Sequence, residues 1–309
     1  MIGLKIKLPD DYLEEEVRCG YTVSKQMKEV WAVQLDMFVE FDRVCRKYGI
    51  KYVASGGTLL GAVRHHGYIP WDDDIDIMLM RDQYNKLCQV APMEFKHPYF
   101  FQTEETDPGF HRWFARLRNS ETTAIQEVEI PYHFKYNQGI FIDIFPMDGV
   151  ADDQKRSLQR RKISHYKSIY YKLLAIEKSI WSDNESHSKR WVKKVAHFLF
   201  GKLVQHTSFT RWAWHKVDET YQMYSNEKTE FVSLLSLQFD NLDHAVRSSS
   251  LNDIIEVDFE FLKMPIFASY DEHLKHKYGD YMTPTMSPNL HGGVIFDTNK
   301  SYTKYVHLK

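Results

Sequence analysis

Residues 49–80 read GIKYVASGGTLLGAVRHHGYIPWDDDIDIMLM, and this stretch decides the fold of the 309-residue chain. Lys51–Ser55 is predicted to form a short strand that ends in the Gly56-Gly57 turn. A short helix should follow, with Thr58 as its N-cap. Turn residues then separate this helix from a second, strongly strand-like run, Ile75–Met80. The stretch therefore predicts a compact strand–helix–strand unit.

Three aspartates alternate with other residues at the start of the second strand. On an extended strand, alternate side chains share a face, so Asp72, Asp74 and Asp76 should point one way and Asp73 the other. Three carboxylates on one face repel each other unless a cation neutralises them. Hard oxygen ligands at this spacing suit Mg²⁺ or Mn²⁺. We expect Asp74 and Asp76 to bind the metal, with Asp72, nearer the loop, as a further ligand.

Two other interpretations of the acidic run fit less well. A calcium loop of the EF-hand type starting at Asp72 would need Gly at its sixth position and Glu at its twelfth, where the chain has Ile77 and Gln83. A merely solvated acidic run does not agree with acids that alternate with isoleucines. The pattern therefore favours a metal site.

The residues between the two strands are suited to bind phosphate. Backbone N–H groups at Gly56, Gly57 and Thr58 could hold phosphate oxygens at the start of a helix. The chain has no GxxxxGK[ST] motif, so it is not a P-loop ATPase. Arg64 ends the short helix and could pair with a diphosphate or only with the helix dipole. The following His65 could be an acid, a base or a surface residue.

A further acid lies in the apolar run Gly139–Pro146, GIFIDIFP. Asp143 is its only charged residue, and a lone carboxylate in such a strand needs a partner or a cation. It could be another metal ligand or a base for an attacking hydroxyl. Asp148 follows in Pro-Met-Asp-Gly and is predicted to form a turn.

The remaining elements indicate an α+β fold. Residues 22–48 have the apolar spacing of one long amphipathic helix, which Gly49 should end. Other segments are predicted as helices at 81–90 and 270–278, and as strands at 99–105, 113–119, 122–129, 139–145, 231–237 and 261–266. We expect residues 1–150 and 231–309 to form one core. Residues 151–230 then form a helical insertion.

The charge is unevenly distributed. The whole chain has 40 Lys and Arg against 42 Asp and Glu, a net of −2. Residues 151–216 have 15 basic and 5 acidic side chains, a net of +10, so the remainder carries −12. The basic segment is also rich in Tyr and Trp. It could contact an anionic membrane surface, or it could be an ordinary packed helical subdomain.

The N-terminus and the cysteines fit a cytoplasmic protein. The first residues lack the apolar segment of a secretory signal. No window holds eighteen uncharged apolar residues, so no transmembrane helix is expected. Cys19, Cys45 and Cys88 are scattered and odd in number, which argues against a cysteine zinc site or a disulfide framework. No nucleic-acid partner is predicted.

Three motifs resemble the LicD family, which also includes fukutin-like proteins. They are GGTLLGAVRHHGYIPWDDDIDI (56–77), IFIDIFPMDG (140–149) and KYGDYMTP (277–284). The resemblance implies a nucleotidyltransferase-like mixed sheet flanked by helices, in which a Gly-rich turn precedes the Asp74-Ile75-Asp76-Ile77 strand. Asp143 would be the third acid, on a neighbouring strand. Where the family usually has Arg shortly before His, this chain has Asn289 and His291.

The resemblance also implies an activity. Family members move a phospho-alcohol such as phosphocholine from a CDP-activated donor onto a glycan, so we expect an Mg²⁺-dependent phosphotransferase that releases CMP. The acceptor would be a cell-surface glycan, as in lipopolysaccharide, teichoic acid or capsule, or its lipid-linked precursor. Bacterial members act from the cytoplasmic side. Separately from the resemblance, the charge and the Trp residues of 151–216 could hold an anionic lipid-linked acceptor at the inner membrane face.

Two alternatives stay open from the residues alone. The same carboxylates could direct attack at the α-phosphate of a nucleotide and release pyrophosphate, as in a true nucleotidyltransferase. The chain could also be a non-enzymatic, cation-dependent glycan- or membrane-binding module. The alternating aspartates argue against the second alternative, because simple binding modules rarely need a trio of buried carboxylates.

Overall fold

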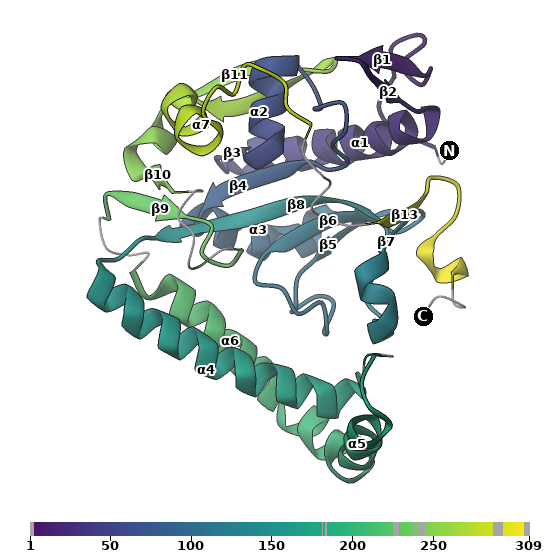
Figure 1. Ribbon diagram of the computed structural model, residues 1–309, viewed down its shortest axis with the longest axis vertical. Coiled ribbons are helices and arrows are strands. Elements are labelled where there is room, and N and C mark those ends of the chain that lie inside the picture. Colours follow the sequence, from purple (N-terminus) through teal and green to yellow (C-terminus); the bar gives the residue numbers. More distant parts are fainter. Residues whose placement is uncertain are drawn as a thin grey trace.

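A computed structural model gives the fold and describes residues 3–180, 182, 184–224, 229–237, 239, 245–286 and 293–305. Its centre is a mixed sheet (Figure 1). The strand order is β3 (Val53–Ala54), β4 (Asp76–Met80), β8 (Ile140–Gly149), β9 (Phe231–Ser233) and β10 (Val246–Arg247). β4 and β8 are parallel, and the other pairings along this order are antiparallel.

β8 is the central strand of this sheet. Every one of its ten residues, IFIDIFPMDG, is buried. β4 pairs with one edge, while β6 (Ala115–Asn119) and β9 pair with the first and last parts of the other edge. β5 (Tyr99–Gln102) extends the sheet beyond β6. A nearly continuous apolar run is typical of a strand buried on both faces, and it places Asp143 in the middle of the sheet, beside β4.

Two helices cover one face of the sheet. α1 (Lys25–Tyr48) packs on β6 and β8, and α3 (Arg81–Glu94) packs on β4 and β8 and contacts α1. α1 begins at Ser24, which accepts a hydrogen bond from the Met27 N–H, and ends at Gly49 with φ 60°. Glycine adopts this left-handed conformation without steric cost. The long helix predicted at 22–48 is thus confirmed.

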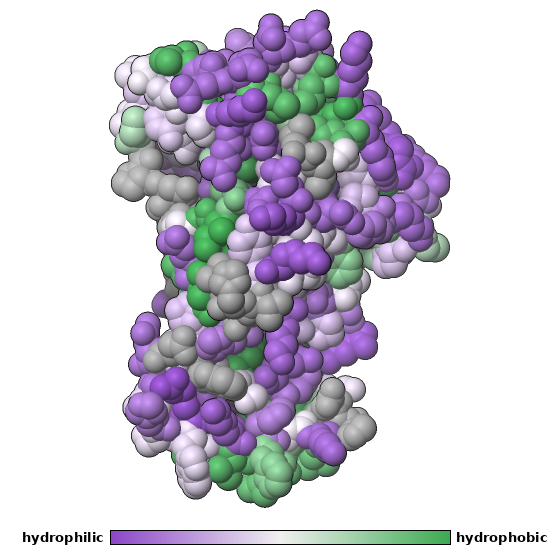
Figure 2. Space-filling view, turned by 90° about the vertical axis from the view of Figure 1, so that its right-hand side faces the viewer, coloured by the Kyte–Doolittle hydropathy of each residue, from purple (hydrophilic) through white to green (hydrophobic). Residues whose placement is uncertain are grey.

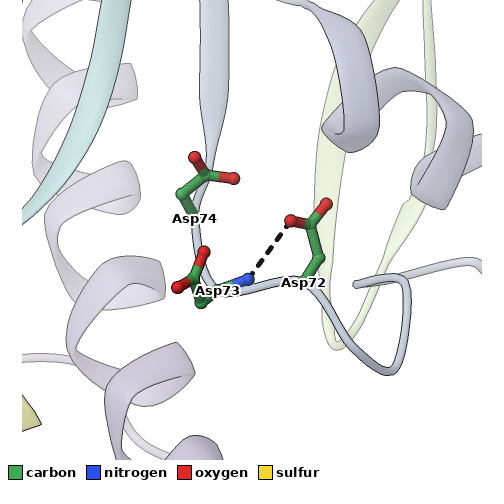
Figure 3. Close-up of side chains that lie close together, drawn as sticks. All are labelled: Asp72, Asp73 and Asp74. Atoms are coloured by element: carbon green, nitrogen blue, oxygen red, sulfur yellow. Dashed lines mark hydrogen bonds between the residues drawn. The ribbon is translucent and has the colours of Figure 1, made fainter. Parts of the chain in front are cut away.

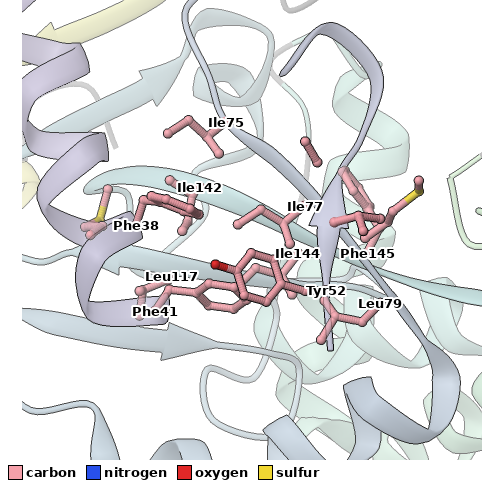
Figure 4. Close-up of a cluster of buried hydrophobic side chains, with 14 of the residues drawn as sticks. Phe38, Phe41, Tyr52, Ile75, Ile77, Leu79, Leu117, Ile142, Ile144 and Phe145 are labelled. Atoms are coloured by element: carbon pink, nitrogen blue, oxygen red, sulfur yellow. The ribbon is translucent and has the colours of Figure 1, made fainter. Parts of the chain in front are cut away.

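Aromatic side chains of α1 fill the space above the sheet. Phe38 and Phe41 lie against Ile77 of β4 and Ile144 of β8 in the buried cluster shown in Figure 4. Each fully buried side chain of this size contributes about 1.5–3 kcal/mol to folding. This packing fixes the long helix over the two strands that carry the acids.

Short pairs of strands surround the central sheet. They are β1 (Glu16–Arg18) with β2 (Tyr21–Val23), β11 (Ile254–Phe259) with β12 (Leu262–Phe267), and β7 (Thr123–Gln126) with β13 (Val294–Asp297). Arg18 donates two hydrogen bonds to Glu260, at 2.6 and 2.9 Å, and so joins the first pair to the turn of the second. α7 (Tyr270–Tyr278) follows β12, and the 3-10 helices are η1 (Glu127–Tyr132), η2 (Gln222–Tyr224), η3 (Ser248–Asn252) and η4 (Tyr302–Lys304).

The described residues of 153–221 include three helices, which lie below the sheet in Figure 1. They are α4 (Asp153–Lys178), α5 (His187–Thr207) and α6 (Phe209–Tyr221). Tyr170, Trp214 and Tyr221 are buried in a second apolar cluster together with Trp113 of the core. Trp113 Nε1 donates to the Trp214 carbonyl, and Trp214 Nε1 donates to the Arg112 carbonyl. These rings therefore form a core, as the packed-subdomain interpretation predicts.

A buried ionic cluster joins β8, α3 and α6. Arg81 donates to both carboxylate oxygens of Asp148, at 2.7 and 2.5 Å, and to Asp218 of α6 at 3.1 Å. The prediction that Asp148 forms a turn is wrong, because β8 continues through Asp148 to Gly149. A fully buried carboxylate needs a cationic partner, and Arg81 provides it.

The structure corrects other details of the sequence prediction. α2 (Gly56–His65) begins two residues before Thr58, and Ser55 occupies the N-cap position. Thr58 instead lies inside the first turn. The strands predicted at 99–105, 122–129 and 231–237 end early, at Gln102, Gln126 and Ser233. The α+β class is confirmed. Within the residues described, no helix is both long and apolar enough to span a bilayer.

Candidate active site

The structure brings together the acids of β4 and β8. Asp76 and Asp143 are paired neighbours on these parallel strands, and the Asp143 N–H donates to the Ile75 carbonyl at 2.8 Å. Asp74 precedes β4 by two residues. One carboxylate oxygen from each of Asp74, Asp76 and Asp143 lies within 4.8 Å of the other two. Segments about 70 residues apart thus form one acidic cluster.

Asp72 and Asp73 precede the strand and lie on a loop. The strand begins only at Asp76, so the alternation expected for Asp72 to Asp76 does not apply to the first three acids. Asp73 was expected to point away, but Asp72, Asp73 and Asp74 form a second group of carboxylates within 4.8 Å of one another. Figure 3 shows these side chains, with the Asp73 N–H donating to Asp72 Oδ1 at 3.2 Å.

Side chains of α1 hold this acidic loop in place. Trp31 Nε1 donates to the Asp72 carbonyl at 3.0 Å, and Gln34 Nε2 donates to the Asp73 carbonyl at 2.7 Å. Tyr68 donates to Gln34 Oε1 and stacks on Trp31, with ring centroids 4.4 Å apart. Gln34 was not predicted as a positioning residue. Its signal was a polar amide inside the apolar stripe of a long helix.

The electrostatics of the cluster fit a divalent cation. Burial raises the pKa of Asp74 well above its usual value, and the neighbouring charges of Asp76, Asp72, Asp73 and Asp143 raise it further. A bound cation would reverse this effect, because it favours the ionised carboxylate. The donor set is made of carboxylate oxygens alone, which is the chemistry that Mg²⁺ and Mn²⁺ prefer.

Asp143 has a cationic partner on the neighbouring strand β6. Arg116 of β6 lies opposite Asp143 in the sheet and donates to Oδ1 at 2.5 Å and to Oδ2 at 3.3 Å. With both oxygens engaged by a guanidinium, Asp143 is better placed to orient a ligand than to remove a proton. Arg116 was not predicted as a site residue, and its signal was an arginine within the short strand ARLRN.

The glycine turn lies directly against the carboxylates. Gly56 has φ 52°, and a Cβ there would stand 3.1 Å from Asp76 Oδ2; one at Gly57 would collide with Asp72 Oδ2. Thr58 Oγ1 accepts a hydrogen bond from the Asp76 N–H at 2.8 Å. The structure therefore places the predicted phosphate-binding residues beside the predicted metal ligands, at the positive end of α2.

The other end of α2 is linked to the segment that follows α7. Arg64 donates to the Tyr281 carbonyl at 2.7 Å, and burial lowers the pKa of its guanidinium. Partial burial and the charges of Asp76 and Asp72 raise the pKa of Tyr278, while Arg64 opposes this shift. Tyr278, 38% exposed, thus lies among the acids and Arg64. It was not predicted as a site residue, although it belongs to the KYGDYMTP motif.

The histidines and the C-terminal motif contribute less. Burial, followed by the charge of Arg64, lowers the pKa of His65 to about 4, so this ring is neutral near pH 7. Its Nε2 accepts a hydrogen bond from Arg64 Nε at 2.9 Å. His65 therefore holds the arginine in place. Asn289 and His291 lie outside the residues that the structure describes.

Comparison with known families agrees with this geometry. Residues 49–178 match the LicD/FKTN/FKRP nucleotidyltransferase domain. The chain contains a LicD-family domain. The matched region includes the glycine turn, all the acids of the site and Arg116. It also extends through α4, so the first helix of the predicted insertion is part of the family match.

Curated relatives include one that matches along most of its length. The chain is 27% identical over 271 residues to the lipopolysaccharide cholinephosphotransferase LicD of Haemophilus influenzae, an alignment that covers 83% of this chain and 91% of that protein. Shorter matches of 54% over 46 residues and 52% over 50 residues link it to uncharacterized proteins of Rickettsia prowazekii and Rickettsia typhi. Each of these covers about a sixth of both proteins.

Proposed function

We propose that this LicD-family protein transfers phosphocholine, or a similar phospho-alcohol, from a CDP-activated donor to a hydroxyl of a cell-surface glycan or its lipid-linked precursor. The observation that carries the proposal is the meeting of Asp74, Asp76 and Asp143 with the Gly56-Gly57 turn. The similarity to a lipopolysaccharide cholinephosphotransferase supports phosphocholine as the transferred group and a glycan as the acceptor.

We propose that the carboxylates hold Mg²⁺ or Mn²⁺. Asp74 and Asp76 would be its principal ligands, Asp72 a further one, and Asp143 would complete the site from β8. The metal would neutralise charge on the donor diphosphate and on the leaving group. The crowding of four aspartates around the buried Asp74 supports this assignment, since the repulsion is relieved when a cation binds.

The residues of α2 would bind the donor. Backbone N–H groups at Gly56 and Gly57 and the Thr58 hydroxyl would hold phosphate oxygens, and Arg64 would offset charge on the departing nucleotide. The acceptor hydroxyl would attack the phosphorus distal to the nucleoside. A new bond forms between the hydroxyl oxygen and this phosphorus, while the bond between the phosphorus and the CMP phosphate breaks. CMP leaves, and the hydroxyl proton is lost. Positioning and charge neutralisation would supply most of the rate.

Product analysis tests the reaction. The purified chain is incubated with CDP-choline, Mg²⁺ and a glycan acceptor, and the nucleotide products are separated by ion-exchange chromatography. We expect CMP in equal amount to the phosphocholine on the glycan. Pyrophosphate released from CTP in the presence of phosphocholine would instead support a nucleotidyltransferase. Glycan binding without turnover would support a binding module and contradict the proposal.

A further inference from the structure

One helix turns a continuous apolar surface to solvent. On α5, six large apolar side chains are more than half exposed: Trp191, Val192, Phe198, Leu199, Phe200 and Leu203. Phe198 is 85% and Trp191 is 66% exposed. Phe198 follows Trp191 by seven residues, which is two helical turns. Leu199 follows Val192 by seven residues and precedes Leu203 by four. These five side chains therefore lie along one side of the helix, with Phe200 at its edge. We call the six residues the α5 apolar face.

The opposite side of α5 makes the contacts with the rest of the protein. Gly201 and Val204 are buried, and His197 Nδ1 lies 2.7 Å from the Ile176 carbonyl of α4. Lys193 pairs with Glu185 at 2.5 Å. An amphipathic helix normally packs its apolar stripe on the core. On α5 the larger apolar side faces outward, so packing against the described part of the chain does not explain it.

Basic residues border the α5 apolar face. Lys189, Lys194 and Lys202 are exposed, and Lys202 follows Phe198 and Leu199 by four and three residues, within the apolar stripe. Residues 151–216 carry the net charge of +10. Figure 2 shows hydrophobic side chains gathered at the lower end of the molecule, where Figure 1 places α5, with hydrophilic surface around them.

We propose that α5 lies flat on an anionic lipid bilayer. Large apolar side chains on one side with lysines around them are the pattern of a helix that inserts shallowly among lipid headgroups. Anionic headgroups would neutralise the lysines. A second copy of the chain is a poorer occupant of this face, because a symmetric contact would bring Lys202 of one copy close to lysines of the other without a counter-charge. The proposal is independent of the reaction at the acidic cluster.

The position of α5 agrees with this role. The ends of β4 and β8 that carry the acids lie on the same side of the molecule as α5, on the right in Figure 1. A bilayer under α5 would therefore meet the protein on the side on which a membrane-anchored acceptor could reach the site. Phe209, at the start of α6, is also more than half exposed.

Vesicle co-sedimentation of the full chain tests the proposal. Vesicles of phosphatidylcholine with phosphatidylglycerol are compared with vesicles of phosphatidylcholine alone. We expect binding to the anionic vesicles, and a drop of at least about tenfold in the partition coefficient for Phe198→Ser/Leu199→Ser. Lys189→Glu/Lys202→Glu should lower binding to anionic vesicles by a similar factor and make it less sensitive to salt.

Two matched variants control for loss of apolar surface and of charge elsewhere. Met93→Ser/Val128→Ser removes exposed apolar side chains from other elements, and Lys25→Glu/Lys51→Glu reverses exposed lysines outside the insertion; both should bind vesicles like the wild type. Equal binding by all variants, or no binding to anionic vesicles, overturns the proposal. So does a wild-type dimer in size-exclusion chromatography that Phe198→Ser/Leu199→Ser dissociates, since a second copy would then cover the face.

Discussion

Single residues of the site divide between those that would bind ligands and those that position them. Asp74 and Asp76 face other carboxylates, whereas Asp143 is engaged on both oxygens by Arg116. Trp31 and Gln34 reach from α1 to the backbone of the acidic loop. The motif spacing predicted the acids and the glycines. It could not predict Arg116 or Gln34, because their roles depend on which strands and helices lie next to each other.

Asp74→Asn should separate activity from stability. The buried carboxylate is surrounded by like charges, so its removal should stabilise the metal-free protein by about 1 kcal/mol. Turnover should fall at least about 100-fold, equivalent to a barrier increase of about 2.7 kcal/mol. Urea denaturation and the CMP assay measure the two effects, with the exposed Asp10→Asn as the control. Activity within about tenfold of the wild type would contradict the assignment of Asp74 as a metal ligand.

Gly57→Ala probes the contact between the glycine turn and the acids. The new methyl group would displace the Asp72 carboxylate, although alanine favours a helix over glycine by up to about 1 kcal/mol. We expect the KM for the donor to rise about tenfold, with the thermal stability unchanged or slightly higher. Gly3→Ala, whose Cβ would meet nothing within 4 Å, is the control. An unchanged KM would show that the glycine turn does not bind the donor.

Among the elements, β8 was predicted correctly in its first half and wrongly in its second. Its first half was expected as a strand with a lone acid, and this is confirmed. Its second half was expected as a turn because Pro-Met-Asp-Gly is typical of turns. Arg81 makes Asp148 tolerable in a buried strand. This arginine begins another helix, α3, far from Asp148 in the sequence. The ion pair with Arg81 therefore outweighs the local preference of Pro-Met-Asp-Gly for a turn.

Arg81→Met should show how the helical region is attached. The substitution leaves Asp148 fully buried and Asp218 largely buried without their cation, which should cost about 3–5 kcal/mol in the free energy of unfolding. Arg247→Met removes an exposed ion pair with Glu230 and should cost less than about 1 kcal/mol. Adding Asp148→Leu and Asp218→Leu to Arg81→Met should restore much of the loss. Equal effects of Arg81→Met and Arg247→Met would contradict this role.

At the scale of the whole molecule, the near-zero net charge is the sum of a basic helical segment and an acidic remainder. Five acids of the core, Asp72, Asp73, Asp74, Asp76 and Asp143, lie at the proposed metal site. The excess of lysine and arginine lies on α4, α5 and α6. We propose that residues 1–150 and 231–309 form the catalytic core and that 151–230 form an insertion, because each part has its own buried apolar cluster. Trp113 and the Arg81 cluster fasten the insertion to the core.

The thermal stability of the protein, measured with each candidate nucleotide, identifies the donor that it binds. CDP-choline, CDP-ribitol, CDP-glycerol and CTP are compared in thermal-shift assays with Mg²⁺ or EDTA. A ligand present at 100 times its Kd adds about 2.7 kcal/mol of stability, so we expect CDP-choline to raise the Tm most, and only with Mg²⁺. Asp76→Asn should abolish this shift. A larger shift with CTP than with any CDP-alcohol would favour the nucleotidyltransferase alternative.

β8 carries Asp143 near one end and Asp148 near the other, and through Asp148 it is tied to the helices that include α5. Because this strand is buried along its whole length and its Asp148 end is held to α6, we expect β8 and the helices together to act as a rigid spacer between the acidic cluster and the α5 apolar face. With α5 on a bilayer, the spacer sets a fixed height of the reaction centre above the lipid. Acceptors would then be selected by reach, since only a hydroxyl held at that height from its membrane anchor meets the donor.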